Sequence, residues 1–180
     1  MSRSVNKPSN EKMETIFTSR IFNVVKKIVT GRSGQPLERY VVVHPGAVAV
    51  LPILDDGRFV LIRQLRVAVD EPLIEVPAGT LEPNEQPLAT AHRELIEETG
   101  YTAGKLTPAM QFYTSPGMLK EAMHLFVAEN LTAGPTNMED GEQIETLLIK
   151  PDQAMSMIAS GEIKDAKTII AILWWNARRD

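Results

Sequence analysis

The distribution of hydrophobic and polar residues predicts a series of strands around one central helix. Residues 16–30 mix apolar and polar positions in a way that suits one or two strands, and residues 37–43 return as their partner after a Gly-rich turn. Residues 47–54 are almost continuously apolar, which is typical of a strand buried on both faces. A second turn leads into a strand predicted over residues 58–66.

The second half of the chain adds further strands and two helices. Residues 105–114, 122–129 and 144–149 are predicted to be strands. A short helix is expected to begin at Pro151, and residues 165–179 have the apolar spacing of an amphipathic helix. Since strands precede, interrupt and follow the central helix, the pattern predicts an α+β or mixed α/β sandwich.

The central helix is predicted from local capping signals. Asn84 can serve as its N-cap, Pro87 is tolerated in a first turn, and Gly100 can adopt the left-handed conformation that ends a helix. One arc of this helix is expected to pack against a sheet. The residues on that arc are Leu88, Ala91, Leu95 and Thr99.

Three carboxylates share a neighbouring arc of the same helix. Glu94, Glu97 and Glu98 are spaced i, i+3 and i+4, so their side chains leave the helix on one side. Arg93 offsets part of their mutual repulsion, but one guanidinium does not neutralise three carboxylates. Hard divalent cations such as Mg²⁺ take oxygen ligands and suit this cluster. A solvated acidic helix face is the alternative explanation of these residues alone.

The residues from Gly79 to Tyr101 resemble the Nudix box of the Nudix hydrolases. Five residues separate Gly79 from Glu85, and seven more precede the run Arg-Glu-Leu-Ile-Glu-Glu-Thr-Gly that begins at Arg93. The one departure is Tyr101, which stands where an aliphatic residue is usual. The resemblance implies a loop–helix–loop that holds divalent metals against a diphosphate. It also implies hydrolysis of a nucleoside diphosphate linked to another group.

This resemblance makes the expected architecture specific. It implies a Nudix fold, in which a mixed β-sheet is sandwiched between helices, with an N-terminal antiparallel β-sheet extension. We expect three segments, namely a flexible tail over residues 1–14, an N-terminal sheet and dimerisation segment over 15–45, and the hydrolase domain over 46–180. In the ADP-ribose pyrophosphatase branch such an N-terminal segment packs on a partner subunit, so a homodimer is expected.

The resemblance also implies the metal and catalytic residues. The expected metal ligands are the backbone carbonyl of Ala78 and the carboxylates of Glu94, Glu97, Glu98 and Glu142. Mg²⁺ is the expected ion, with Mn²⁺ as the alternative. Glu142 is the first choice for a general base, and Asp140 in the same polar loop is the second. Glu97 and Arg93 complete the catalytic set, Arg93 by orienting the acids.

Five positions are expected to contact the substrate. Arg39 and Arg66 stand where the family has arginines, although a surface salt bridge is the alternative for each. Glu75 stands at a family substrate position, and a structural role is its alternative. Pro116 lies fifteen residues beyond the end of the box, in a Ser-Pro-Gly tripeptide followed by Glu121. This placement resembles the ADP-ribose and nucleotide-sugar pyrophosphatases, whereas the tripeptide alone predicts only a turn.

Composition narrows the classes of function. The 180 residues carry a net charge of −4 without a basic cluster, so nothing indicates a nucleic-acid partner. The absence of cysteine excludes disulfides, thiol nucleophiles and thiolate metal sites. No apolar run approaches the roughly 20 residues of a membrane span, and the N-terminus lacks the apolar core of a signal peptide. We therefore expect a cytoplasmic protein without a membrane partner.

The sequence thus predicts metal-dependent hydrolysis of the diphosphate bond of ADP-ribose or a related nucleoside diphosphate sugar. The products would be a nucleoside monophosphate and a sugar phosphate. Two alternatives stay open. One is a preference for GDP-mannose or another nucleoside diphosphate hexose, and the other is a Nudix-fold binding module without hydrolysis. The second alternative is disfavoured because all three box acids are present.

Overall fold

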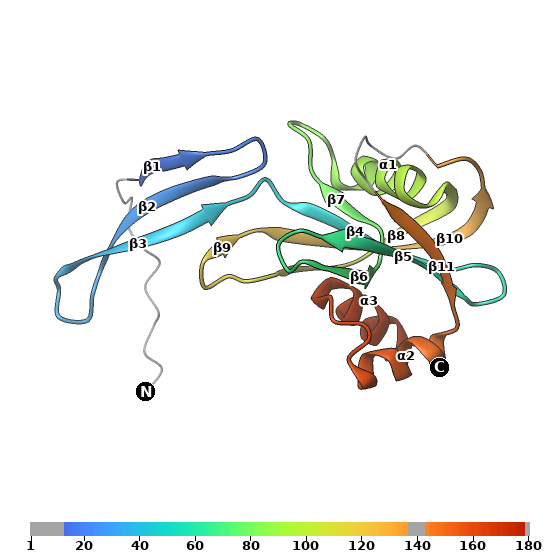
Figure 1. Ribbon diagram of the computed structural model, residues 1–180. Coiled ribbons are helices and arrows are strands. Elements are labelled where there is room, and N and C mark those ends of the chain that lie inside the picture. Colours follow the sequence, from blue (N-terminus) through green and yellow to red (C-terminus); the bar gives the residue numbers. More distant parts are fainter. Residues whose placement is uncertain (1–12, 137–142, 179–180) are drawn as a thin grey trace. The chain divides into compact units, whose positions relative to one another are not determined.

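The computed structural model describes residues 13–136 and 143–178, and these residues form two compact units (Figure 1). The first unit contains residues 13–45 together with residues 115–121, and the second contains the remaining described residues. The excursion of residues 115–121 into the first unit was not predicted, because nothing in a Pro-Gly turn indicates which sheet it joins. Pro116 and Glu121 therefore belong to the first unit.

The first unit is built on one four-stranded sheet with the order β1-β2-β3-β9. Its strands are β1 (Met13–Thr18), β2 (Asn23–Thr30), β3 (Pro36–Val43) and β9 (Leu119–Lys120). The first three strands are antiparallel, as predicted, and the two-residue β9 runs parallel to β3. Strand β1 begins inside the segment predicted to be a tail, and the earlier tail residues, 1–12, lie outside the described residues.

The second unit contains a mixed sheet with the order β7-β4-β10-β8. Its strands are β7 (Ala78–Thr80), β4 (Ala47–Pro52), β10 (Ala122–Ala133) and β8 (Tyr101–Tyr113). Strand β10 is parallel to β4 and antiparallel to β8. Every residue of β4 is buried, which confirms the prediction from its continuous apolar run.

A second, antiparallel sheet in this unit has the order β11-β5-β6. Its strands are β11 (Ile144–Ile149), β5 (Phe59–Arg66) and β6 (Glu71–Glu75). Strand β5 supplies fully buried side chains at its start and polar ones toward its end. The short strands β6, β7 and β9 were not predicted, because segments of two to five residues carry too little periodicity to be recognised.

Three helices complete the second unit, α1 (Pro87–Thr99), α2 (Pro151–Ser160) and α3 (Ala166–Asn176). Gly100 ends α1 with a φ of 73°, as predicted. The predicted N-cap is wrong: Gln86 caps α1 in an extended conformation, and Asn84 has a φ of 68° in the preceding turn. None of the helices in the described residues is long and apolar enough to cross a membrane.

The core lies on both faces of β4. Alternate side chains of β4 point to opposite faces of the sheet. Val48 and Val50 on one face pack with Ala91 and Leu95 of α1. Ala49 and the other side chains of the opposite face pack with α2 and α3. Figure 1 shows α1 on one side of the sheet and α2 and α3 on the other. The prediction of a mixed sheet between helices is confirmed. The arc predicted for α1 is wrong only at Leu88, which is 46% exposed.

Candidate active site

Arg93 is the centre of the ion-pair cluster on α1. Its guanidinium donates to both carboxylate oxygens of Glu85, at 3.2 and 3.1 Å. It also donates to Oε1 of Glu94 at 2.7 Å and to Oε2 of Glu97 at 2.9 Å. A longer hydrogen bond of 3.4 Å reaches the carbonyl of Thr80 in β7. One cation therefore ties together three acids and the strand that precedes the helix.

The other box acid, Glu98, points toward the loop before the helix. Glu98 is only 3% exposed, and its Oε2 accepts a hydrogen bond of 2.9 Å from the backbone N–H of Ala78. The next residue, Gly79, lies directly beneath the Glu94 carboxylate, where a Cβ atom would overlap the carboxylate carbon and both oxygens. The lack of a side chain at Gly79 is what allows Glu94 to approach β7.

Electrostatics keep Arg93 and Glu85 ionised. The hydrogen bonds that Arg93 donates to Glu85 raise the pKa of Arg93 far above its usual value, although partial burial opposes the shift; the charge of Glu94 and the hydrogen bonds to Glu97 and Glu94 add to it. Reciprocally, the hydrogen bond from Arg93 lowers the pKa of Glu85. Both shifts favour the charged forms, so Arg93 and Glu85 form an ion pair at neutral pH.

The donor set fits a hard divalent cation. Glu94, Glu97 and Glu98 offer carboxylate oxygens, and the carbonyl of Ala78 lies next to the N–H that binds Glu98. Within residues 13–136 and 143–178, no three His, Asp or Glu side chains already stand close enough together to hold an ion. A cation would therefore share Glu94 and Glu97 with Arg93, which now binds both.

Arg66 and Glu75 form a second ionic group in the same unit. The Arg66 guanidinium donates to both oxygens of Glu75, each at 2.7 Å. Glu75 is 1% exposed and also binds the ammonium of Lys167. Burial raises the pKa of Glu75, but the hydrogen bond from Arg66 and the charge of Lys167 lower it by more, so the pKa falls below its usual value. Lys167 was not predicted from the sequence.

Arg66 also lies within electrostatic range of the box. The hydrogen bond to Glu75 is the main reason why the pKa of Arg66 is raised, and the negative charge of Glu98 contributes. The structure places Arg66 in an ionic group with Glu75 and Lys167, and its role in substrate binding stays a prediction. The pair that Arg66 forms with Glu75 is a salt bridge. A salt bridge and a contact with substrate are therefore compatible explanations of Arg66.

The remaining substrate candidates, Arg39, Pro116 and Glu121, belong to the first unit. The side chain of Arg39, in β3, donates to the carbonyl of Glu38 at 3.1 Å and is exposed. Pro116 is exposed in the segment before β9. Glu121 pairs with Nδ1 of His44 at 3.4 Å, and both side chains are largely buried. Their roles in binding stay predictions. The base candidates Asp140 and Glu142 lie outside the described residues.

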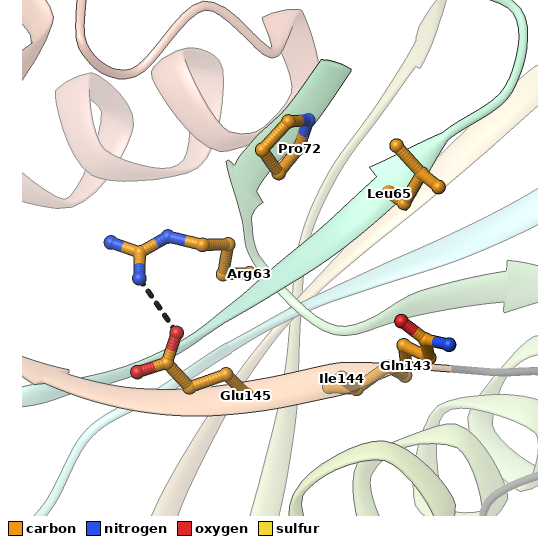
Figure 2. Close-up of a pocket in the computed structure, with 6 residues that line it drawn as sticks. All are labelled: Arg63, Leu65, Pro72, Gln143, Ile144 and Glu145. Carbon is orange, nitrogen blue, oxygen red and sulfur yellow. Dashed lines mark hydrogen bonds and ion pairs between the residues drawn. The ribbon is translucent and has the colours of Figure 1, made fainter. Parts of the chain in front are cut away.

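A shallow pocket of about 330 Å³ lies elsewhere, on the β11-β5-β6 sheet. Figure 2 shows the Arg63 side chain directed toward Glu145 on the neighbouring strand, and Nη1 of Arg63 donates to Oε2 of Glu145 at 2.6 Å. Leu65 also lines this pocket, whereas Arg66 is the next residue along β5 and so points to the opposite face of the sheet. None of the residues predicted for the active site lines it.

Comparison with known proteins identifies the family of the chain. The model of the NUDIX domain matches residues 43–171. The chain is 40% identical to an ADP-ribose pyrophosphatase of Bacillus subtilis, covering 88% of this chain and 87% of the relative. It is 37% identical to a methanol dehydrogenase activator of Bacillus methanolicus, covering 89% and 88%. It is 39% identical to a GDP-mannose pyrophosphatase of Citrobacter koseri, covering 71% of each.

A solved structure supports the same fold. The crystal structure of an ADP compounds hydrolase aligns with a TM-score of 0.82 at 24% sequence identity, covering 98% of this chain and 96% of that one. The match of the domain model includes the whole segment from Gly79 to Tyr101, in which the Arg93 cluster and the Glu98 contact were found. The chain belongs to the Nudix hydrolase family.

Proposed function

We propose that this Nudix hydrolase cleaves the diphosphate bond of ADP-ribose or a closely related nucleoside diphosphate sugar, releasing a nucleoside monophosphate and a sugar phosphate. The observation that carries the proposal is the arrangement of the box acids. Glu94 and Glu97 are held by Arg93, and Glu98 is held by the N–H of Ala78. The similarity to a relative named for ADP-ribose hydrolysis supports the choice of substrate.

The chemistry requires the negative charge of the diphosphate to be offset before water can attack phosphorus. A divalent metal ion, which we propose to be Mg²⁺ with Mn²⁺ as a substitute, supplies this neutralisation and lowers the pKa of a bound water. The proposed ligands are the carbonyl of Ala78 and the carboxylates of Glu94, Glu97 and Glu98, with Glu142 from the later loop. Arg93 fixes the orientation of the acids through its five hydrogen bonds.

Other residues are proposed to bind the substrate phosphates and to remove the proton from water. Arg66 is the proposed ligand of the substrate phosphates, since its side chain is 37% exposed and its guanidinium has donors beyond the two that bind Glu75. Glu142 is the proposed general base, and Asp140 is the alternative from the same loop. GDP-mannose is the second candidate substrate, because relatives named GDP-mannose pyrophosphatase cover 71% of the chain at 38–39% identity.

A product assay separates these substrates. With Mg²⁺ in excess, we expect ADP-ribose to give AMP and ribose 5-phosphate with a higher kcat/KM than GDP-mannose, UDP-glucose, NADH, dinucleoside polyphosphates or nucleoside triphosphates. Products are identified by chromatography and mass spectrometry. A higher kcat/KM for GDP-mannose would move the assignment to the second candidate, and no hydrolysis of any of these compounds would refute the proposed function.

We further propose that the protein is a homodimer that uses the first unit. Large hydrophobic side chains are exposed on the strands and turns of this unit, and exposed apolar patches are a common feature of protein interfaces. They include Met13, Ile16, Phe17, Ile21, Leu37 and Tyr40. Light scattering at micromolar concentration should give twice the mass of the 20.0 kDa chain. A mass of one chain under these conditions would contradict the dimer.

A further inference from the structure

The N-terminus of α3 is fixed by a compact set of hydrogen bonds. Asp165 is the N-cap, and its Oδ2 accepts from the backbone N–H of Thr168 at 2.9 Å and from the Thr168 hydroxyl at 2.6 Å. Its other oxygen accepts from the ammonium of Lys167 at 3.0 Å. Because a side-chain cap restrains the first helical turn, the side chains of Lys167 and Thr168 are held in defined directions.

Both of these side chains contact the strand that leads into the box. The backbone N–H of Val76 donates to the hydroxyl of Thr168 at 2.8 Å, and the Lys167 ammonium donates to Oε2 of Glu75. Two consecutive residues of α3, Lys167 and Thr168, thus bind the consecutive residues Glu75 and Val76. Thr168 is 0% exposed and Glu75 is 1% exposed, so these contacts are shielded from water. Polar contacts in such surroundings are stronger than those of a surface ion pair.

The Glu75 carboxylate is shared between Lys167 and Arg66. Arg66 binds it through two hydrogen bonds of 2.7 Å, and Lys167 binds the same Oε2 oxygen that accepts from Nη2 of Arg66. Together with Asp165, the group contains two cations and two carboxylates. Loss of the ammonium would leave one guanidinium with two carboxylates. The field at the exposed side of Arg66 would then be less favourable to an anion.

We propose that Lys167 is a positioning residue for substrate binding, which acts through Glu75 to keep Arg66 oriented and electrostatically available to the diphosphate. Lys167 itself is 11% exposed and is directed at Glu75 and Asp165, so the effect passes through Arg66 rather than through contact with substrate. This inference rests on the proposed role of Arg66 as a phosphate ligand. It assigns a function in the active site to the C-terminal helix, which is distant in sequence from the box.

The test is steady-state kinetics of Lys167 variants with ADP-ribose and saturating Mg²⁺. Lys167→Gln keeps a hydrogen-bond donor and removes the charge. We expect its KM to rise about tenfold with kcat changed by less than about twofold, since binding rather than chemistry is weakened. Lys167→Arg, which retains the charge, should return KM to within about twofold of the parent value. A KM of Lys167→Gln equal to that of the parent would overturn the proposal.

A neighbouring lysine provides the matched control. Lys164 pairs with Glu71 at 2.9 Å, but both side chains are about half exposed. Lys164→Gln therefore removes the same charge from the same region and should leave KM unchanged, because exposed pairs contribute little. If Lys167 were merely structural, its variant would show a lower unfolding temperature and a smaller active fraction, while the KM of the active molecules stayed the same. That pattern would also overturn the proposal.

A double-mutant cycle separates this inference from the proposed function. Arg66→Gln should raise KM, and adding Lys167→Gln to it should change KM by less than about twofold, because the residue through which Lys167 acts is already gone. Independent, additive increases would overturn the proposal while leaving Arg66 as a ligand. An unchanged KM in Arg66→Gln would instead refute the proposed role of Arg66, and the inference with it.

Discussion

Replacing Glu98 with glutamine should reduce kcat about 1,000-fold, which corresponds to about 4 kcal/mol of lost transition-state stabilisation. The substitution keeps the shape of the side chain and removes its charge. A neutral amide is a much poorer ligand for a divalent cation than a carboxylate, so the charge on the diphosphate would no longer be offset at this position. The measurement is turnover of ADP-ribose at saturating Mg²⁺, with Mg²⁺ affinity measured by calorimetry.

The fold should survive this change. The amide oxygen of glutamine can still accept the hydrogen bond from the N–H of Ala78, which the Glu98 carboxylate accepts at 2.9 Å. The unfolding temperature is therefore expected to stay close to that of the parent. The matched control is Glu129→Gln, which removes an exposed carboxylate paired with Lys105 and should leave turnover unchanged. Turnover of Glu98→Gln near the parent rate would refute its assignment as a metal ligand.

The parts of the fold that were predicted correctly depend on local physical chemistry. Proline is tolerated in the first turn of a helix and glycine adopts the left-handed conformation that ends it, so Pro87 and Gly100 mark the two ends of α1. A strand buried on both faces must be apolar throughout, and the run from residue 47 has this property. The spacing of the box acids likewise required only the geometry of one helix.

The parts that were missed depend on contacts between distant segments. Lys167 and Glu75 are 92 residues apart, and no local pattern distinguishes this lysine from an ordinary surface residue. The N-cap was misplaced because Asn84 has a favoured capping side chain, whereas the helix begins at Pro87 and is preceded by Gln86, which makes no side-chain cap hydrogen bond. The inclusion of residues 115–121 in the first unit depends on the pairing of β9 with β3, which involves two residue pairs.

Arg93 shows how sequence and structure complement each other. Its position four residues before Glu97 predicts a single ion pair on the helix. The structure adds three partners that the helical spacing does not predict, namely the adjacent Glu94, Glu85 from the loop and the carbonyl of Thr80 from β7. Arg93 therefore joins the helix to the loop and strand that precede it, so the position of the box acids depends on this strand as well as on α1.

Gly79, in that same strand, gives the second large effect. A Cβ atom at this position would overlap the terminal atoms of Glu94, while the backbone of Gly79 has no positive φ that an alanine would resist. Gly79→Ala should therefore fold normally and displace only the Glu94 carboxylate from Arg93. We expect kcat/KM to fall about 100-fold, because a misplacement of about 1 Å in a catalytic group has an effect of this order.

Combining Gly79→Ala with Glu94→Gln shows whether the loss of kcat/KM arises from the overlap between the new Cβ atom and Glu94. If alanine at position 79 acts by displacing Glu94, then Gly79→Ala should add less than about threefold to the loss already caused by Glu94→Gln, because both changes disable the same carboxylate. A multiplicative loss in the double variant would mean that the Cβ disturbs something other than Glu94. Since the fold tolerates the alanine, unfolding temperatures of all three variants should remain near that of the parent, which separates displacement of a ligand from loss of structure.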